Sequence, residues 1–109
     1  MSELYNIVFT SFAETQIDHI INYLKENESE QVTNEVKQGI FDAIKDLVKM
    51  PHRHGILQLV SDEAITYRRV LKWAYIIVFH INENKKEVVI VDISHAKQDP
   101  QKLVRRLSD

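Results

Sequence analysis

Apolar and polar residues alternate close to the N-terminus, and a helical period follows. The stretch 4-LYNIVFT-10 places Ile7 and Phe9 on one side of an extended chain, and such alternation predicts a strand. Ser11 and Glu14 have the spacing of a capping box, in which the hydroxyl caps the helix and the carboxylate reaches back to the cap. We therefore expect a strand over residues 4–10 and then a helix capped by Ser11.

Two amphipathic helices are predicted next, joined by a short polar segment. Their apolar positions recur at helical spacing, at Ala13, Ile17, Ile20, Ile21 and Leu24 in the first and at Val32, Val36, Ile40, Ile44, Leu47 and Val48 in the second. The first helix should end near 26-ENES-29, where Ser29 can cap the second. Pro51 should stop the second helix at about Lys49. So short a connection predicts an antiparallel helical hairpin.

Gly39 is an unusual residue for the inside of the second predicted helix. A glycine there costs about 1 kcal/mol relative to alanine. Either the neighbouring helix approaches closely at this position, or packing elsewhere tolerates the weakness.

Three strand signals occupy the second half of the chain, at residues 64–72, 74–81 and 88–93. Little separates the first two strands, and a polar loop joins the last two, so both connections are expected to be hairpins. The second and third strands are apolar on both alternating faces, which is typical of a sheet that is covered on both sides. The helical hairpin can cover one face, and the C-terminal segment or a partner must cover the other.

The C-terminal segment begins with Asp99 and Pro100, a pair suited to the N-cap and first turn of a helix. Its narrow apolar stripe consists of Leu103, Val104 and Leu107. We expect this segment to be a short helix or an extended arm.

One α+β domain is therefore expected over residues 1–109, in the order β-α-α-β-β-β plus the tail. The helical hairpin should pack on one face of a small antiparallel sheet. The most buried residues are expected to be Ile7, Phe9, Ile20, Leu24, Ile40, Ile44, Ile77 and Val91.

Composition removes several classes of function. The 109 residues contain no cysteine, which excludes disulfides, thiolate catalysis and cysteine-based zinc sites. That absence fits a reducing cytoplasm, which is the expected location. No apolar run approaches the ~18 residues of a membrane span, and no signal peptide is visible, so no membrane partner is expected. His52 and His54 share one turn without a third ligand nearby, so no metal or other cofactor is expected.

Charge is unevenly distributed, although the net charge is only −2. Residues 1–50 carry nine acidic and four basic side chains, a net of −5, whereas residues 51–109 carry ten basic and seven acidic ones, a net of +3. Such an asymmetry favours directional contacts with other macromolecules. The near balance overall is unlike a protein that binds ribosomal RNA or duplex DNA through charge.

Polar residues gather where the last predicted strand ends, in 91-VDISHAKQDPQKL-103. His95 either bonds to the backbone as an ordinary strand-end residue or belongs to a functional site. Arg68 and Arg69 lie on opposite faces of their strand, so at most one of them can face a given site. The other is expected to pair with an acid on a neighbouring strand, such as Asp92.

Several short motifs, in this order of elements, carry a resemblance to a known family. They are 47-LVKMP-51, 67-YR-68, 75-YIIVFHI-81 and 91-VDISHAKQDPQKL-103. With them the chain resembles, from its first strand to its tail, the RelE/ParE superfamily of toxins from type II toxin–antitoxin modules. The tail pattern His-x-Lys-x-Asp-Pro is similar to the His-x-Arg-x-Asp of the ParE branch.

The resemblance implies a plasmid-stabilisation toxin that a cognate antitoxin neutralises in a hetero-oligomer. In the ParE branch the implied target is DNA gyrase, which is poisoned without a catalysed covalent step. In the RelE branch the implied activity is ribosome-dependent cleavage of messenger RNA. A non-toxic member that serves as a binding module is a further alternative.

Ribonuclease chemistry needs a base, an acid and cations that stabilise the phosphorane. The catalytic candidates for that reading are His95, Arg68 and Lys97. Lys97 stands where the family usually has Arg, and no tyrosine or second histidine follows His95. Because the acid–base set is incomplete, we favour a binding poison over an enzyme. Its target-binding surface is expected to consist of Arg68, Arg69, His95, Lys97, Lys102, Arg105 and Arg106.

Overall fold

The computed structural model describes residues 4–57, 65–97 and 100–108. Its elements are β1 (Asn6–Phe9), α1 (Ser11–Asn27), α2 (Glu30–Lys45), β2 (Arg68–Lys72), β3 (Tyr75–Asn82), β4 (Glu87–His95) and α3 (Pro100–Ser108). Two short 3-10 helices, Asp46–Val48 and Pro51–Arg53, follow α2. The α+β class and the predicted order of elements are confirmed, and the tail is a helix that begins at Pro100. Asp99, the predicted cap of this helix, lies outside the described residues.

The sheet has the strand order β1-β4-β3-β2. Antiparallel pairs join β2 to β3 and β3 to β4, whereas β1 and β4 run parallel, so the sheet is mixed rather than antiparallel throughout. The two hairpins must be antiparallel because tight turns connect their strands. Most of the chain separates β1 from β4, so no turn dictates the direction of that pair.

The caps of the hairpin helices differ in part from expectation. Thr10, not Ser11, caps α1, because its Oγ1 accepts a hydrogen bond from the backbone N–H of Ala13 at 3.1 Å. Ser29 caps α2 as predicted, accepting from Val32 at 3.1 Å. α2 itself ends at Lys45, and a 3-10 helix occupies the residues before Pro51 that were expected to be α-helical.

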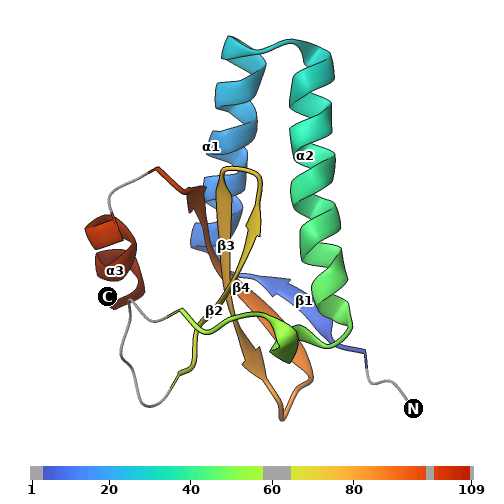
Figure 1. The fold of residues 1–109 in the computed structure, drawn as a ribbon, viewed down its shortest axis with the longest axis vertical. Coiled ribbons are helices and arrows are strands. Elements are labelled where there is room, and N and C mark those ends of the chain that lie inside the picture. The colour runs from blue at the N-terminus through green and yellow to red at the C-terminus, as the bar shows by residue number, and fades with distance from the viewer. Residues whose placement is uncertain (1–3, 58–64, 98–99, 109) are drawn as a thin grey trace.

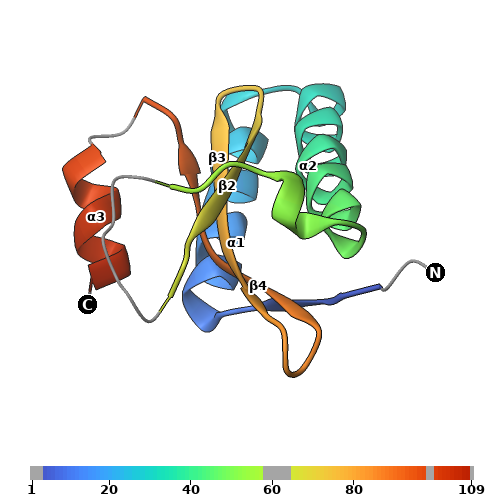
Figure 2. The same cartoon turned by 60° about the horizontal axis from the view of Figure 1, so that its bottom comes forward.

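Each face of the sheet has its own apolar cluster. Helices α1 and α2 lie side by side over one face, and α3 lies apart from them (Figures 1 and 2). The hairpin-side cluster is buried around Ala13, Ile17, Ile40, Ile44, Leu47, Ile77, Phe79, Val88, Ile90 and Ile93. The α3-side cluster is smaller and consists of Leu57, Tyr67, Val78 and Leu103, with half-buried neighbours.

The predicted core is confirmed in part. Leu24, Ile40, Ile44 and Ile77 are buried. Ile7, Phe9 and Ile20 are half-buried at the edge of the hairpin-side cluster, and Val91 is half-buried in the α3-side cluster. Ile7 and Phe9 lie on an edge strand, where coverage is incomplete.

A β-bulge explains the position of Val91. Val78 on β3 pairs with Asp92, but the next residue, Phe79, pairs with Ile90, so Val91 is the extra residue in β4. Because a bulge shifts the alternation by one residue, Asp92 faces the α3 side, whereas Ile90 and Ile93 both face the hairpin.

Gly39 is explained by a side chain rather than by a neighbouring helix. The indole of Trp73, from the turn between β2 and β3, packs directly against Gly39, and a Cβ at that position would overlap the ring. Trp73 remains 60% exposed and has a positive φ of 51°. The close approach that we expected is present, but its source is the β2–β3 turn.

Candidate functional site

Arg68 is held by backbone groups rather than left free for a target. Its Nη1 donates hydrogen bonds to the carbonyl oxygens of His52, at 3.1 Å, and His54, at 2.8 Å. Hydrogen bonds from a charged donor are among the stronger ones in proteins. Arg68 therefore fastens the 3-10 helix Pro51–Arg53 to β2, which is a structural role that the sequence did not indicate.

Arg106 is likewise committed to the fold. Its Nε lies 2.7 Å from Oδ2 of Asp92, and its Nη2 lies 3.2 Å from Oδ1. Asp92 is 0% exposed and the Arg106 side chain is 22% exposed, so the pair is largely withdrawn from water. The expectation that Asp92 pairs with Arg68 or Arg69 was wrong, because β3 lies between β2 and β4 and Asp92 pairs with Arg106 of α3 instead.

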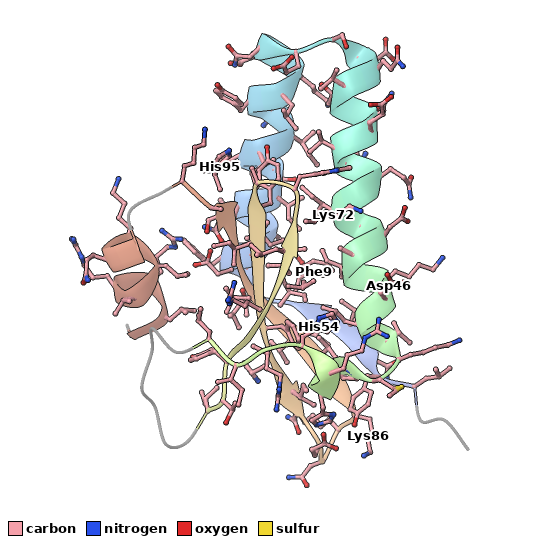
Figure 3. The ribbon with its side chains drawn as sticks, viewed as in Figure 1. Phe9, Asp46, His54, Lys72, Lys86 and His95 are labelled. Carbon is pink, nitrogen blue, oxygen red and sulfur yellow. The ribbon has the colours of Figure 1, made fainter. Side chains whose placement is uncertain are left out.

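His95 lies beside α1, on the hairpin side of the sheet (Figure 3). The N–H of Lys97 donates to its Nδ1 at 3.1 Å, and its ring meets the ring of Tyr75 edge-on with centroids 5.4 Å apart. Since Nδ1 accepts a hydrogen bond, Nε2 carries the proton in the neutral imidazole. His95 therefore does bond to the backbone, which is one of the two alternatives that the sequence left open for it.

Two of the three ribonuclease candidates, Arg68 and His95, lie far apart. Arg68 pairs across to Phe79 of β3, whereas His95 pairs to Tyr75, and these positions are four residues apart, or about 13 Å along the strand. Figure 3 shows the same separation, with His95 at one end of the sheet and His54, whose carbonyl binds Arg68, toward the other. One phosphate group cannot contact both side chains.

Four of the predicted cations remain exposed: Arg69, Lys97, Lys102 and Arg105. We call three of them, Arg69, Lys102 and Arg105, the α3-side cations. Arg69 pairs with Val78, a member of the α3-side cluster, so it lies on that side of the sheet. Lys97 follows the end of β4, and the other two project from α3. Among the residues that the structure describes, no acidic side chain forms an ion pair with any of these four.

A groove that the sequence did not indicate lies between α1 and the adjoining ends of β3 and β4. Its volume is about 540 Å³, and we call it the α1 groove. Its polar and aromatic lining includes His19 and Tyr23 of α1, Glu28 after α1, Tyr75 of β3 and His95 of β4. His19 and Tyr23 are four residues apart, so they share one helix face; this spacing is the one signal in the sequence that could have found them.

Tyr75, which lines this groove, is half-buried. Burial raises the pKa of Tyr75, and the nearby Tyr23 hydroxyl raises it further. The phenol therefore stays protonated and uncharged at neutral pH.

A polar cluster lies at the end of the sheet opposite the α1 groove. One carboxylate oxygen of Glu83 lies 2.6 Å from Nε2 of His52 and the other 3.0 Å from Nζ of Lys86, while the Tyr5 hydroxyl donates to the same carboxylate at 3.2 Å. The hydrogen bond from Lys86 is the largest cause that lowers the pKa of Glu83. His80 lies nearby, and its pKa is lowered by burial. No group of three metal-binding side chains lies close together among the residues that the structure describes.

Comparison with family models gives one match. Residues 7–100 match the model described as the ParE toxin of the type II toxin–antitoxin system parDE. The chain belongs to the ParE toxin family. No match was found among curated proteins. No helix in the described part of this toxin chain is both long and apolar enough to cross a bilayer.

Solved structures show the same fold in related toxins. The chromosomal ParDE toxin–antitoxin system of P. aeruginosa matches with a TM-score of 0.67 at 17% identity, over 88% of this chain and 100% of that one. The RelBE2 toxin–antitoxin complex of Mycobacterium tuberculosis matches with 0.57 at 20% identity, over 86% and 94%. The archaeal RelE–RelB complex of Pyrococcus horikoshii matches with 0.58 at 9% identity, over 88% and 99%. At these identities the likeness concerns the fold.

Proposed function

We propose that this ParE-family toxin inhibits growth by binding DNA gyrase through the α3-side cations, without catalysing a reaction. The observation that supports this proposal most strongly is the separation of Arg68 from His95, which takes away one of the two cationic candidates, Arg68 and Lys97, for RNA cleavage at His95. The exposed Arg69, Lys97, Lys102 and Arg105 suit an acidic protein surface or a DNA backbone instead.

The same proposal includes a cognate antitoxin that neutralises the toxin in a hetero-oligomer in the cytoplasm. The structural relatives were solved as toxin–antitoxin systems and complexes. Apolar surface is available at the β1 edge, where Val8, Phe12 and Phe41 are exposed and β1 pairs on its outer side with no other strand of the described chain. An amphipathic helix or an added strand is the form of partner that such a surface binds.

A paired assay tests the proposed target. Purified toxin is incubated with gyrase, supercoiled plasmid and ATP, and linear DNA released by denaturant is quantified. In parallel, the toxin is added to ribosomes that hold a defined messenger RNA, and cleavage is mapped. We expect linear DNA to accumulate in proportion to toxin and the messenger RNA to stay intact.

Two results would contradict the proposal. Cleavage of the ribosome-bound message with intact plasmid would identify a ribonuclease. Activity in neither assay, together with normal growth when the chain is expressed without an antitoxin, would identify a non-toxic binding module.

A further inference from the structure

The α1 groove has aromatic walls over an apolar floor. Ile20 and Leu24 of α1 contribute the floor, and Tyr23, Tyr75 and His95 contribute rings to the walls. Tyr23 is 62% exposed, although it belongs to a helix that packs on the sheet with its other face. Aromatic faces attract cations through their quadrupole, and an apolar floor suits the methylene stem of a long side chain.

The charge of the groove also favours a cation. Glu28 is the single aspartate or glutamate among the described residues that line it, and no described lysine or arginine does so. Residues 11–45, which form the helical hairpin, carry seven acidic and three basic side chains, a net of −4. An anion entering the groove would meet a carboxylate and no lysine or arginine, so phosphates and acidic peptides are disfavoured.

The end of α1 adds a third contribution. Glu28 is the C-cap of α1, so the groove lies where the last carbonyl groups of that helix gather. The C-terminal end of a helix carries a partial negative charge that stabilises nearby cations. The Glu28 carboxylate and the C-terminal end of α1 therefore both attract a cation in the groove.

We propose that the α1 groove binds a basic side chain, arginine in particular, from a partner polypeptide. The Glu28 carboxylate pairs with the guanidinium, the rings of Tyr23 and Tyr75 contact its plane, and the apolar floor holds its stem. Arginine fits better than lysine because its planar, weakly hydrated head stacks on aromatic rings. This site is separate from the α3-side cations, and its ligand has the opposite charge from the one that those cations attract.

The experiment uses the toxin alone, so its failure leaves the gyrase proposal untouched. Isotope-labelled toxin is titrated with N-acetyl-arginine amide, and the backbone amide shifts of Ile93, Ser94 and His95 are followed by NMR. The neutral isostere N-acetyl-citrulline amide has the same shape without the charge. We expect saturable shifts with arginine and binding about tenfold weaker with citrulline.

Two variants locate the ligand. Glu28→Gln removes the carboxylate at an exposed position and should weaken arginine binding about threefold. Glu26→Gln removes the same charge from α1 outside the groove and should leave binding unchanged. Tyr23→Leu, also at an exposed position, should weaken arginine more than citrulline.

Several outcomes would overturn the proposal. Equal binding of the arginine and citrulline probes would show that the groove does not distinguish a charged ligand from a neutral one. Equal losses of binding in Glu28→Gln and Glu26→Gln would show a diffuse electrostatic effect. Tighter binding of adenosine or N-acetyl-glutamate amide would assign the groove to a base or an anion. The absence of saturable shifts with any probe would mean that the groove does not bind side chains of this kind.

Discussion

The two faces of the sheet are covered in different ways. On one face, the 17-residue α1 and the 16-residue α2 bury a broad apolar cluster. On the other, the nine-residue α3 adds Leu103 to a small cluster and fixes its position with the Asp92–Arg106 pair. Apolar burial is strong but permits many orientations, whereas a bidentate ion pair is geometrically specific. The hairpin therefore provides most of the stability, and the ion pair sets the orientation of α3.

The two sides also differ in surface charge. The hairpin segment 11–45 has a net charge of −4, whereas α3 carries Lys102, Arg105 and Arg106 without an acid between Pro100 and Ser108. Under the two proposals above, the acidic groove meets one partner and the cationic helix meets another. The first two of the following predictions compare how firmly the two sides are held.

The largest effect is expected from truncating the two clusters in parallel. Ile77→Ala removes a fully buried side chain of the hairpin-side cluster and should lower the free energy of unfolding by about 2–5 kcal/mol. Leu103→Ala on α3 should cost less, about 1–3 kcal/mol, because α3 can detach and relieve the cavity. Urea denaturation measures both. Equal losses would show that α3 is as firmly part of the core as α1 and α2.

Removing one partner of the ion pair should free α3. Arg106→Leu leaves the buried Asp92 carboxylate without its cation, and the loss of stability should be about 1–3 kcal/mol, capped by the cost of undocking α3. Hydrogen exchange should show faster exchange in α3 while β3 stays protected. Adding Asp92→Asn to Arg106→Leu should recover part of the stability, because no buried charge remains; a further loss in that double variant would contradict this account.

Stability should decrease as the pH falls below about 6.5. Burial lowers the pKa of both His54 and His80, so between their folded values and the ordinary value of 6.5 the unfolded chain binds more protons than the folded one. The free energy of unfolding therefore rises with pH across that window and levels off above it. Urea titrations from pH 7.5 to 5 measure the slope, and His80→Gln should reduce it. An unchanged slope in that variant would exclude His80 as a contributor.

The smallest effect concerns Gly39. In an ordinary helix Gly→Ala would stabilise by about 1 kcal/mol, but here the added Cβ must displace the Trp73 indole. The net change should stay within about 1 kcal/mol, while the tryptophan fluorescence changes clearly. In a Trp73→Ala background, Gly39→Ala should give the full stabilisation. The same gain with Trp73 present would mean that the indole does not rest on α2.

The sequence was sufficient for the elements because burial leaves a period in the chain. The stripe that includes Ile40 and Ile44 predicted a helix with its buried face correctly placed, and the apolar faces of β3 and β4 predicted a sheet covered on both sides. No local pattern indicates that β1 runs parallel to β4, because that direction depends on how the whole sheet is assembled.

The site was harder to predict because one extra residue reverses the faces of a strand. The bulge at Val91 turns Asp92 toward α3 and His95 toward α1, so residues that are close in sequence serve opposite sides. The sequence also does not indicate which group a side chain will bind. From the sequence Arg68 and Arg106 were expected to be surface cations, but both form hydrogen bonds within the fold. Lys102 and Arg105, which were predicted to bind the target, are exposed because they lie on the polar face of an amphipathic helix, and their binding to a target stays a prediction.

The central claim, a poison that binds through its α3 side, is tested most directly by gyrase-dependent DNA cleavage with charge-reversed toxin. Lys102→Glu with Arg105→Glu reverses two exposed cations of α3, and Lys25→Glu with Lys45→Glu reverses two exposed cations of the hairpin as a matched control. At 150 mM salt the account predicts about a tenfold loss of linear DNA for the first pair, a partial loss for each single change, and near-normal activity for the control. His95→Gln should retain activity. A loss of about 10²-fold in His95→Gln with the fold intact, or an equal loss in both charge-reversed pairs, would contradict the account.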